Sequence, residues 1–289
     1  MARKNENALV VRGDLSVADL KAQAQASALR KKYGHLAQED AHASEGASEG
    51  APTISSDNLA WSLRGGETIG FARSDRGPGQ EIPVIVLAHA FHNALMPGRY
   101  VKGQQPEIEC AAASETLEGL APPATWPREK RGAEKCQLCP HNAFGSGDNG
   151  KGKACRNASL LVVLPLHNAD PADFNAKWIA KAALHRIFVS PTSMKSWAKY
   201  AATVVDEKKG AGLPLSGVVT LATVRPDDKN KQAVDFSVAS TVPVGMMDAV
   251  LARRAEAREI ALRPPQYVAP QATGAKPAGG KRVAPKKKR

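Results

Sequence analysis

Residues 218–224, Val-Val-Thr-Leu-Ala-Thr-Val, and residues 233–239, Ala-Val-Asp-Phe-Ser-Val-Ala, decide the fold class of this chain. β-branched residues dominate the first run, and Val and Phe occupy alternate positions of the second, as is typical of strands. The segment between them carries Pro226, Asp227 and Asp228, which are turn-forming residues. The stretch 218–239 therefore predicts a β-hairpin with a charged tip.

Further strands and three helices are expected upstream and downstream of this hairpin. The helices are expected over 172–183, from Pro191 with Ser190 as its cap, and over 244–262 before Pro264. Apolar, β-branched runs bounded by turn residues predict strands at 61–63, 68–71, 82–87, 160–164 and 187–189. Strands and helices do not alternate regularly, as they would in a parallel α/β fold. We therefore expect a mainly β protein with a few helices (α+β), built as an OB-like, partly open antiparallel barrel.

The chain of 289 residues divides by composition into a core and two flanks. Residues 1–55 form a polar, partly helical or disordered N-terminal arm that ends in a low-complexity linker. Residues 56–262 form the OB-like core, and a metal-binding insertion of residues 97–157, rich in Pro and Gly, interrupts it. Residues 263–289 form a basic tail that is too polar to pack and is expected to be disordered.

Charge and hydropathy limit the partners of the chain. The net charge is +12, and residues 264–289 contribute +7 of it because they contain no acidic residue. A polyanion such as nucleic acid is the expected partner of this tail, and a solubilising role is the alternative. No run of about 18 apolar residues is present, so we expect no membrane span. No apolar segment of a signal peptide follows the N-terminus, so we expect a cytoplasmic protein.

All four cysteines fall in the insertion of residues 97–157, as Cys110, Cys136, Cys139 and Cys155. A Cys-x-x-Cys pair presents two thiolates from one turn, and two distant cysteines complete the tetrahedron that holds structural zinc. An iron–sulfur cluster needs the same four thiolates, so spacing alone does not distinguish it from Zn²⁺. A dithiol with two bystander cysteines is the remaining alternative.

Cys110 is the least certain of these four ligands. His141 and His92 are the residues that could replace it. We do not expect disulfides, because the cytosol is reducing.

The insertion is also cationic, with a net charge of +4 over residues 128–156. Lysine and arginine side chains contact phosphates, and aromatic rings stack on unpaired bases. Phe144 and Trp126 could instead pack against the metal-binding turn. Contacts to nucleic acid are expected from Tyr100, Trp126, Arg128, Lys130, Arg131, Lys135, Phe144, Lys151, Lys153, Arg156, Lys286, Lys287, Lys288 and Arg289.

The sequence contains no recognisable catalytic constellation, so we expect no enzyme activity. Residues 145–152 match the first seven positions of a phosphate-binding P-loop, but Gly152 replaces the Ser or Thr that holds magnesium. No hydrophobic strand precedes this segment, so we reject a nucleotide hydrolase. The sequence also lacks an evident carboxylate cluster, which a metal-dependent nuclease would need.

Three segments resemble phage-encoded single-stranded-DNA-binding proteins, some of which have a zinc loop inserted in an OB barrel. They are Cys136-Gln-Leu-Cys139-Pro-His-Asn-Ala-Phe-Gly-Ser with the following Gly150-Lys-Gly-Lys-Ala-Cys155, the segment Pro191-Thr-Ser-Met-Lys-Ser-Trp, and Val218-Val-Thr. The resemblance spans about residues 56–262. It implies an OB fold and a non-enzymatic role on replication or recombination intermediates, in the cytosol of a bacterial host. Such proteins commonly end in an acidic segment that recruits partners, whereas this chain ends in Lys-Lys-Lys-Arg.

The sequence therefore predicts a zinc-containing protein that binds single-stranded DNA with little sequence preference, and RNA is a possible second ligand. Replication or recombination proteins are the expected protein partners. The alternative is an adaptor that uses the zinc loop to contact a protein and binds DNA only through its basic tail.

Overall fold

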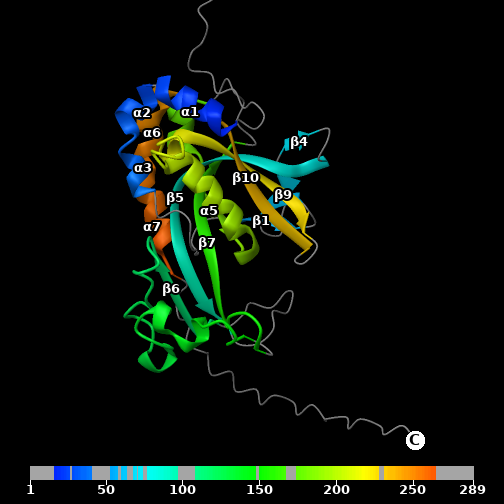
Figure 1. Cartoon of the computed structure of the whole chain (residues 1–289), viewed down its shortest axis with the longest axis vertical. Helices are drawn as coiled ribbons and strands as arrows, with labels where there is room; N and C mark the ends of the chain where they lie inside the picture. The colour runs from blue at the N-terminus through cyan, green and yellow to red at the C-terminus, as the bar shows by residue number, and fades with distance from the viewer. Residues whose placement is uncertain are drawn as a thin grey trace, which may run out of the picture.

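The computed structural model describes residues 16–26, 28–40, 53–57, 60–63, 68–69, 71–73, 77–96, 108–147, 150–166, 174–227 and 231–264. Within these residues the fold is one mainly antiparallel sheet with a few helices, as expected from the sequence (Figure 1). The strands are β1 (Thr53–Asp57), β2 (Ala60–Leu63), β3 (Thr68–Ile69), β4 (Phe71–Arg73), β5 (Gly77–Leu95), β6 (Cys110–Ser114), β7 (Cys155–Pro165), β8 (His185–Val189), β9 (Val218–Asp227) and β10 (Lys231–Thr241).

The sheet follows the order β10-β9-β5-β7-β8-β1-β2-β3, and β4 and β6 also pair with β5. The described pairings are antiparallel except that of β1 with β8, which is parallel. The predicted hairpin of residues 218–239 is confirmed as β9 and β10, which pair from Val218 opposite Thr241 to Asp227 opposite Lys231.

The sheet curls back on itself but stays open within the described residues. Trp61 on β2 donates its indole N–H to the carbonyl of Ala222 on β9, with 3.1 Å between the nitrogen and the oxygen. This contact joins strands that lie far apart in the strand order, and β2 also packs against β5. The strands at the two ends of the path, β10 and β3, are not paired with each other in this part of the chain. The expectation of a mainly antiparallel α+β fold is met, and the expected OB-like, partly open barrel is not confirmed.

Strand β5 is the longest element and connects the core to the cysteines. It pairs with β9 near its start, with β7 from Val84 to Leu95, and with β6 from Phe91 to Leu95. A bulge at Leu87, between Val86 and Ala88, interrupts the register with β7 and allows the strand to bend. The sequence predicted only residues 82–87 of this strand.

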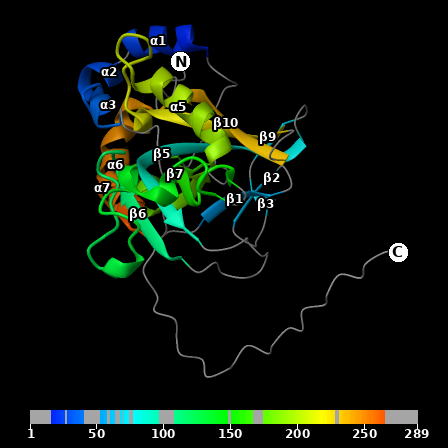
Figure 2. The ribbon, with the colours of Figure 1, turned by 60° about the horizontal axis from the view of Figure 1, so that its bottom comes forward.

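Helices cover both faces of the central strands. Consecutive residues of β5 and β7, from Ile82 to Leu87 and from Leu160 to Leu166, are buried, as expected of strands covered on both faces. The helix α5 packs against β10 and β7, and α7 packs against β5 and β7, and the two helices lie on different sides of these strands (Figure 2). The helices are α1 (Val17–Ala26), α2 (Ala28–Tyr33), α3 (Leu36–Glu39), α4 (Ala176–Lys181), α5 (Pro191–Val205), α6 (Met247–Ala252) and α7 (Arg254–Leu262).

Two of the helix predictions need correction in detail. Ser190 occupies the cap position of α5, but its hydroxyl contacts those of Thr192 and Ser193 instead of a backbone N–H. The helix expected over 244–262 is a 3₁₀ turn, Val244–Met246, followed by α6 and α7, which are separated at Arg253.

The N-terminal helices pack into the main core, and they lie in the residues that the sequence predicted to form a polar, partly helical or disordered arm. Leu20, Leu29 and Tyr33 are buried among the residues of the main core. Asp40 at the end of this segment accepts the backbone N–H of Leu215 at 2.7 Å and pairs with Arg254 at 2.8 Å. These contacts connect the N-terminal helices α1, α2 and α3 to the segment before β9 and to α7.

No helix within the described ranges is long and apolar enough to cross a membrane.

Candidate metal centre and the cationic loop

Two of the four cysteines lie on strands of the main sheet, not in a separate loop. Cys110 begins β6 and Cys155 begins β7, and both face Leu95, the last residue of β5, in the pairing register. The two cysteines therefore flank the end of β5 on opposite sides and project from the same face of the sheet. The expected insertion of residues 97–157 is thus anchored by sheet hydrogen bonds at both cysteines.

The other two cysteines come from a short turn above that face. Cys136 and Cys139 lie within and directly after a 3₁₀ turn, Cys136–Leu138, and the N–H of Cys139 donates to the carbonyl of Cys136. The side-chain amide of Asn142 also donates to the carbonyl of Cys136, at 2.9 Å, and the backbone N–H of Asn142 donates to the carbonyl of Cys139. These bonds fix the spacing of the Cys-x-x-Cys pair before any ligand is considered.

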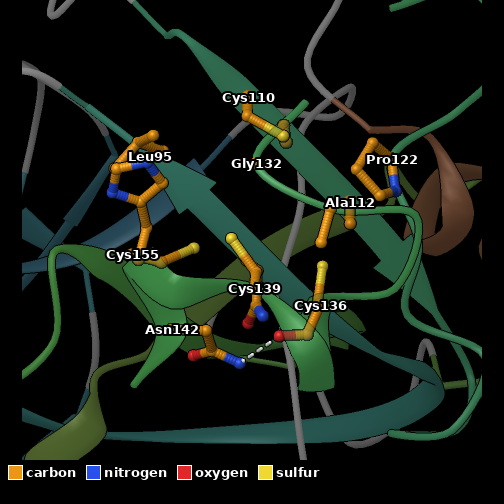
Figure 3. A pocket seen from close by; sticks show the side chains of 13 residues that line it. Leu95, Cys110, Ala112, Pro122, Gly132, Cys136, Cys139, Asn142 and Cys155 are labelled. Carbon is orange, nitrogen blue, oxygen red and sulfur yellow. Dashed lines mark hydrogen bonds between the residues drawn. The ribbon is translucent and has the colours of Figure 1, made fainter. Parts of the chain in front are cut away.

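All four cysteines line one cavity of about 20 Å³ at the end of the molecule opposite α1 and α2. Figure 3 shows Cys139 and Cys155 directing their sulfur atoms toward one another, with Cys110 and Cys136 on other sides of the same space. The four thiols are free and are not paired as disulfides. The convergence of all four, which spacing alone could not show, brings together the donor set of a tetrathiolate metal site.

Burial raises the pKa of three of these thiols. Burial and the neighbouring cysteines together raise the pKa of the Cys136 thiol to about 11 and that of Cys155 to about 12. Burial also raises the pKa of Cys110, and a hydrogen bond from the backbone of Gly132 partly opposes this shift. A bound cation would favour the thiolate forms.

The four sulfur atoms are not arranged as the ligands of one metal ion. No group of three or more His, Cys, Asp or Glu side chains in the described part of the chain has donor atoms placed to hold a metal ion as they stand. The pairing register gives the reason, because Leu95 lies between Cys110 and Cys155. An ion would have to draw these two side chains inward over Leu95.

The two histidines considered as substitutes for Cys110 differ in their position relative to the thiols. His141 lines the thiol cavity. His92 is buried on β5, and its Nε2 lies 3.0 Å from the carbonyl oxygen of Ala261 on α7. We therefore retain His141 as a possible ligand and remove His92.

Trp126 is not available as a stacking ring, which corrects the sequence-based expectation. Its side chain is 1% exposed, and its indole N–H donates to the carbonyl of Glu109 at 2.7 Å. Arg131 is similarly engaged, since its guanidinium donates to the carbonyls of Trp126 and Ala124. Both residues stabilise the loop instead of presenting a surface to a ligand.

Phe144 stands out from the loop and is 84% exposed. Leu138, which the sequence analysis did not single out, is 77% exposed in the same cysteine-containing region. Exposed apolar side chains that gather in one region mark interaction sites more often than scattered ones do. The cationic residues at or near the surface of this region are Arg128, Lys130, Lys135, Lys151, Lys153 and Arg156.

The segment that resembled a P-loop is a glycine turn that pairs with itself. The N–H of Gly145 donates to the carbonyl of Gly152 at 2.6 Å, and Gly145, Gly150 and Gly152 have positive φ angles. Strand β7 follows at Cys155, where a P-loop requires a helix. Lys153 donates to the side-chain oxygen of Asn142 at 3.2 Å, which joins this turn to the Cys-x-x-Cys segment.

Several predicted contacts cannot be located. Tyr100 and the tail residues Lys286, Lys287, Lys288 and Arg289 lie outside the described residues.

Two residues of the site were missed by sequence reasoning. Asn93 and Gly132 line the cavity, and a Cβ atom on Gly132 would lie 2.5 Å from the sulfur of Cys139. Asn93 lies two positions before Leu95, so its side chain projects from the same face of β5 as that of Leu95. This could be predicted only with the knowledge that β5 extends to Leu95.

The chain matches no protein-family model, no curated protein and no solved structure.

Proposed function

We propose that this protein binds single-stranded nucleic acid through a loop that one zinc ion organises. The observation that carries the proposal is the convergence of Cys110, Cys136, Cys139 and Cys155 on one cavity beneath a cationic loop with an exposed ring. The proposal assigns the protein a binding role and no catalysis, with proteins of replication or recombination as possible partners.

The size of the cavity favours a single ion over a cluster. One water molecule needs about 10–15 Å³ of such space, so 20 Å³ accommodates one atom-sized occupant. An iron–sulfur cluster contains several iron and sulfide atoms and would need a larger displacement of the loop. Zinc with four thiolates takes a tetrahedral arrangement with zinc–sulfur distances of about 2.3 Å. Cys110, Cys136, Cys139 and Cys155 would hold it, and the ion would supply structure and no chemistry.

A metal would matter because the loop has little core of its own. A small cluster separate from the main core contains Phe91, Ala112, Leu120 and Cys136, and the indole of Trp126 is the other large buried side chain of the loop. In residues 143–147 and 150–154 the hydroxyl of Ser146 contributes hydrogen bonds, because it donates to the carbonyls of His141 and Ala143 and accepts from the N–H of Ala154. A metal ion at the thiols would join β6, β7 and the Cys-x-x-Cys turn at one point.

The surface chemistry of the loop suits an unpaired strand. Phe144 offers a free ring face, and base stacking on such a ring contributes about 1–3 kcal/mol per base. Lys135 and Lys151 are exposed in the same loop, Arg156 is exposed at the start of β7, and all three would contact phosphates. A duplex hides the faces of its bases, so a stacking ring prefers single strands.

The OB-like barrel remains part of the proposal. The contact between Trp61 and Ala222 brings β2 to β9 across the curled sheet, and this curvature supports a partly open barrel. A five-stranded barrel of this kind commonly binds oligonucleotides.

One experiment tests the nucleic-acid proposal without the contribution of the tail. The chain lacking residues 264–289 is titrated into a labelled oligonucleotide, either single-stranded or as the same sequence in a duplex, at physiological salt. We expect tighter binding to the single strand, and we expect Phe144→Ala to reduce this preference by about 1 kcal/mol or more. Phe188→Ala is the matched control, because Phe188 is also exposed but lies on β8, away from the loop. Equal or stronger binding of the duplex would refute the assignment.

A second candidate function rests on Leu138. An exposed aliphatic side chain packs better against a protein than on a base, so Leu138 favours an adaptor whose zinc loop contacts a protein partner. In that case Leu138→Ala and Phe144→Ala leave strand preference unchanged in the same titration.

A further inference from the structure

Asn93 is a polar side chain buried among the small residues of the cavity floor. It lies on β5, opposite Ala112 of β6 and Asn157 of β7 in the pairing register. Its side chain is 3% exposed and lines the cavity of the four thiols.

The amide of Asn93 lacks the partner that its burial requires. Its nitrogen Nδ2 makes no hydrogen bond of normal geometry in the structure, although an amide carries two N–H donors. A buried donor without an acceptor destabilises the folded state. Cys136 lines the same cavity as Asn93, and a weak contact from the Asn93 amide partly opposes the rise that burial causes in the pKa of this thiol.

A protonated thiol is a poor partner for this donor. Its sulfur is a weak acceptor, whereas the sulfur of a thiolate carries negative charge and accepts stronger hydrogen bonds. Zinc with four thiolates has a net charge of −2, and N–H donors around the sulfurs offset part of this charge. Residues that hold metal ligands by such bonds strongly affect affinity for the metal.

We propose that Asn93 is a positioning residue of the metal centre, which donates its side-chain N–H to the sulfur of Cys136 when that sulfur binds the ion. The inference rests on the proposed function, because it requires the four thiols to hold a metal. It assigns a purpose to an amide that is otherwise buried without a partner.

Asn157 offers a competing explanation and a matched control. Its side-chain oxygen Oδ1 is also buried without a partner, and Asn157 lies directly across from Asn93 on β7. The two amides could bond to each other after a small rotation, which would make Asn93 a purely structural residue. Asn157 does not line the cavity, so its replacement changes the same strand pair without touching the thiols.

The test compares the zinc affinity of the full chain with that of three variants, by competition with a chromophoric chelator. Asn93→Leu removes the donor and keeps a similar volume, Asn93→Asp replaces the donor with an acceptor, and Asn157→Leu is the control. The melting temperature of each protein without metal is measured in parallel.

We expect both Asn93 variants to bind zinc about 10–100-fold more weakly and Asn157→Leu to bind it as the parent does. We also expect Asn93→Leu without metal to be at least as stable as the parent, because a buried unpaired donor has been removed. A residue with a merely structural role would lower stability and affinity together.

Parent-like zinc affinity in Asn93→Leu and Asn93→Asp would overturn the inference, and so would an equal loss in Asn157→Leu. A parent chain that binds no zinc would instead refute the proposed metal centre, which is a separate result. If Asn93→Leu fails to fold, Asn93→Asp with its unchanged shape gives the same comparison.

Discussion

Replacing Trp126 by alanine tests whether the cysteine-containing loop is stabilised independently of the main core. The indole is fully buried but is not among the residues of the main core. A buried aromatic side chain of this kind covers 150–250 Å², which at about 25 cal/mol per Å² corresponds to roughly 4–6 kcal/mol. Measured Trp→Ala changes in cores fall near 3–5 kcal/mol.

We expect this destabilisation to unfold the loop locally and to leave the main core folded. Its small cluster of apolar residues is separate from the main core, so residues 115–154 should open while β5, β7 and β9 remain folded. Hydrogen exchange followed by mass spectrometry should then show loss of protection in the loop alone. The global melting temperature should fall by less than about 4 °C, which corresponds to roughly 1 kcal/mol in a domain of this size.

Trp197 provides the matched control, because it is an equally buried tryptophan that belongs to the main core. It stacks near His89 and contacts Phe236 edge to face. Trp197→Ala should destabilise the fold by about 3–5 kcal/mol. At about 2–4 °C per kcal/mol, this loss lowers the melting temperature by about 6–20 °C. If Trp126→Ala lowers it equally, the loop is not an independent unit and the reasoning fails.

Three further predictions concern pH, the tail and the cavity wall. Burial, followed by the charges of His89 and Arg186, holds the pKa of His92 well below its usual 6.5, so the unfolded chain takes up a proton that the folded chain does not. The stability that neutral His92 provides is therefore complete above about pH 7 and is lost as pH falls, by up to about 1.4 kcal/mol per pH unit. Urea unfolding between pH 7.5 and 5 should show a smaller loss in His92→Gln, and identical losses would contradict the assignment. Removing residues 264–289 should leave the melting temperature nearly unchanged, because α7 ends at Leu262, and should weaken nucleic-acid binding at low salt. The slope of the logarithm of the binding constant against the logarithm of the salt concentration should become shallower by about 0.7 for each phosphate that the tail neutralises. An unaltered slope would show that the tail does not bind nucleic acid. Gly132→Ala should release the metal, since its Cβ would displace the sulfur of Cys139, and retention of metal at parent-like affinity would show that Cys139 is not a ligand.

The hairpin and the helix at Pro191 were predictable because local sequence determines them. Strand β9 begins with a run rich in β-branched residues, β10 places Val234, Phe236 and Val238 at alternate positions, and Pro191 suits the first turn of a helix. The full length of β5 was not predictable in the same way. Its second half, from Ala88 to Leu95, contains two histidines and an asparagine, and it is extended because β6 and β7 pair with it on both sides.

Other elements depend on contacts between distant residues. Strand β6 reads Cys-Ala-Ala-Ala-Ser, a composition with weak strand preference, and its pairing with β5 defines it. The N-terminal helices have a weak apolar pattern, and their place in the core depends on partners such as Leu215 and Arg254, which lie far away in sequence.

The grouping of the four cysteines was predictable from the sequence, but the surroundings of the cysteines were not. The Cys-x-x-Cys spacing and two distant cysteines indicated a four-thiol site, and the four residues do line one cavity. The same reasoning could not separate Phe144 from Trp126, because both are aromatic residues in a cationic loop. Only burial distinguishes the free ring from the packed one.

The metal content of the full chain, purified without chelator and measured by inductively coupled plasma mass spectrometry, tests the four-thiol site without any further assumption. We expect one zinc ion per chain and its loss in Cys139→Ser, because all four thiols line one cavity of atomic size. Protein that contains no zinc, and takes up none when zinc is supplied, would refute the metal centre. Protein that contains several iron atoms per chain, with absorption near 400 nm, would contradict the single-ion site.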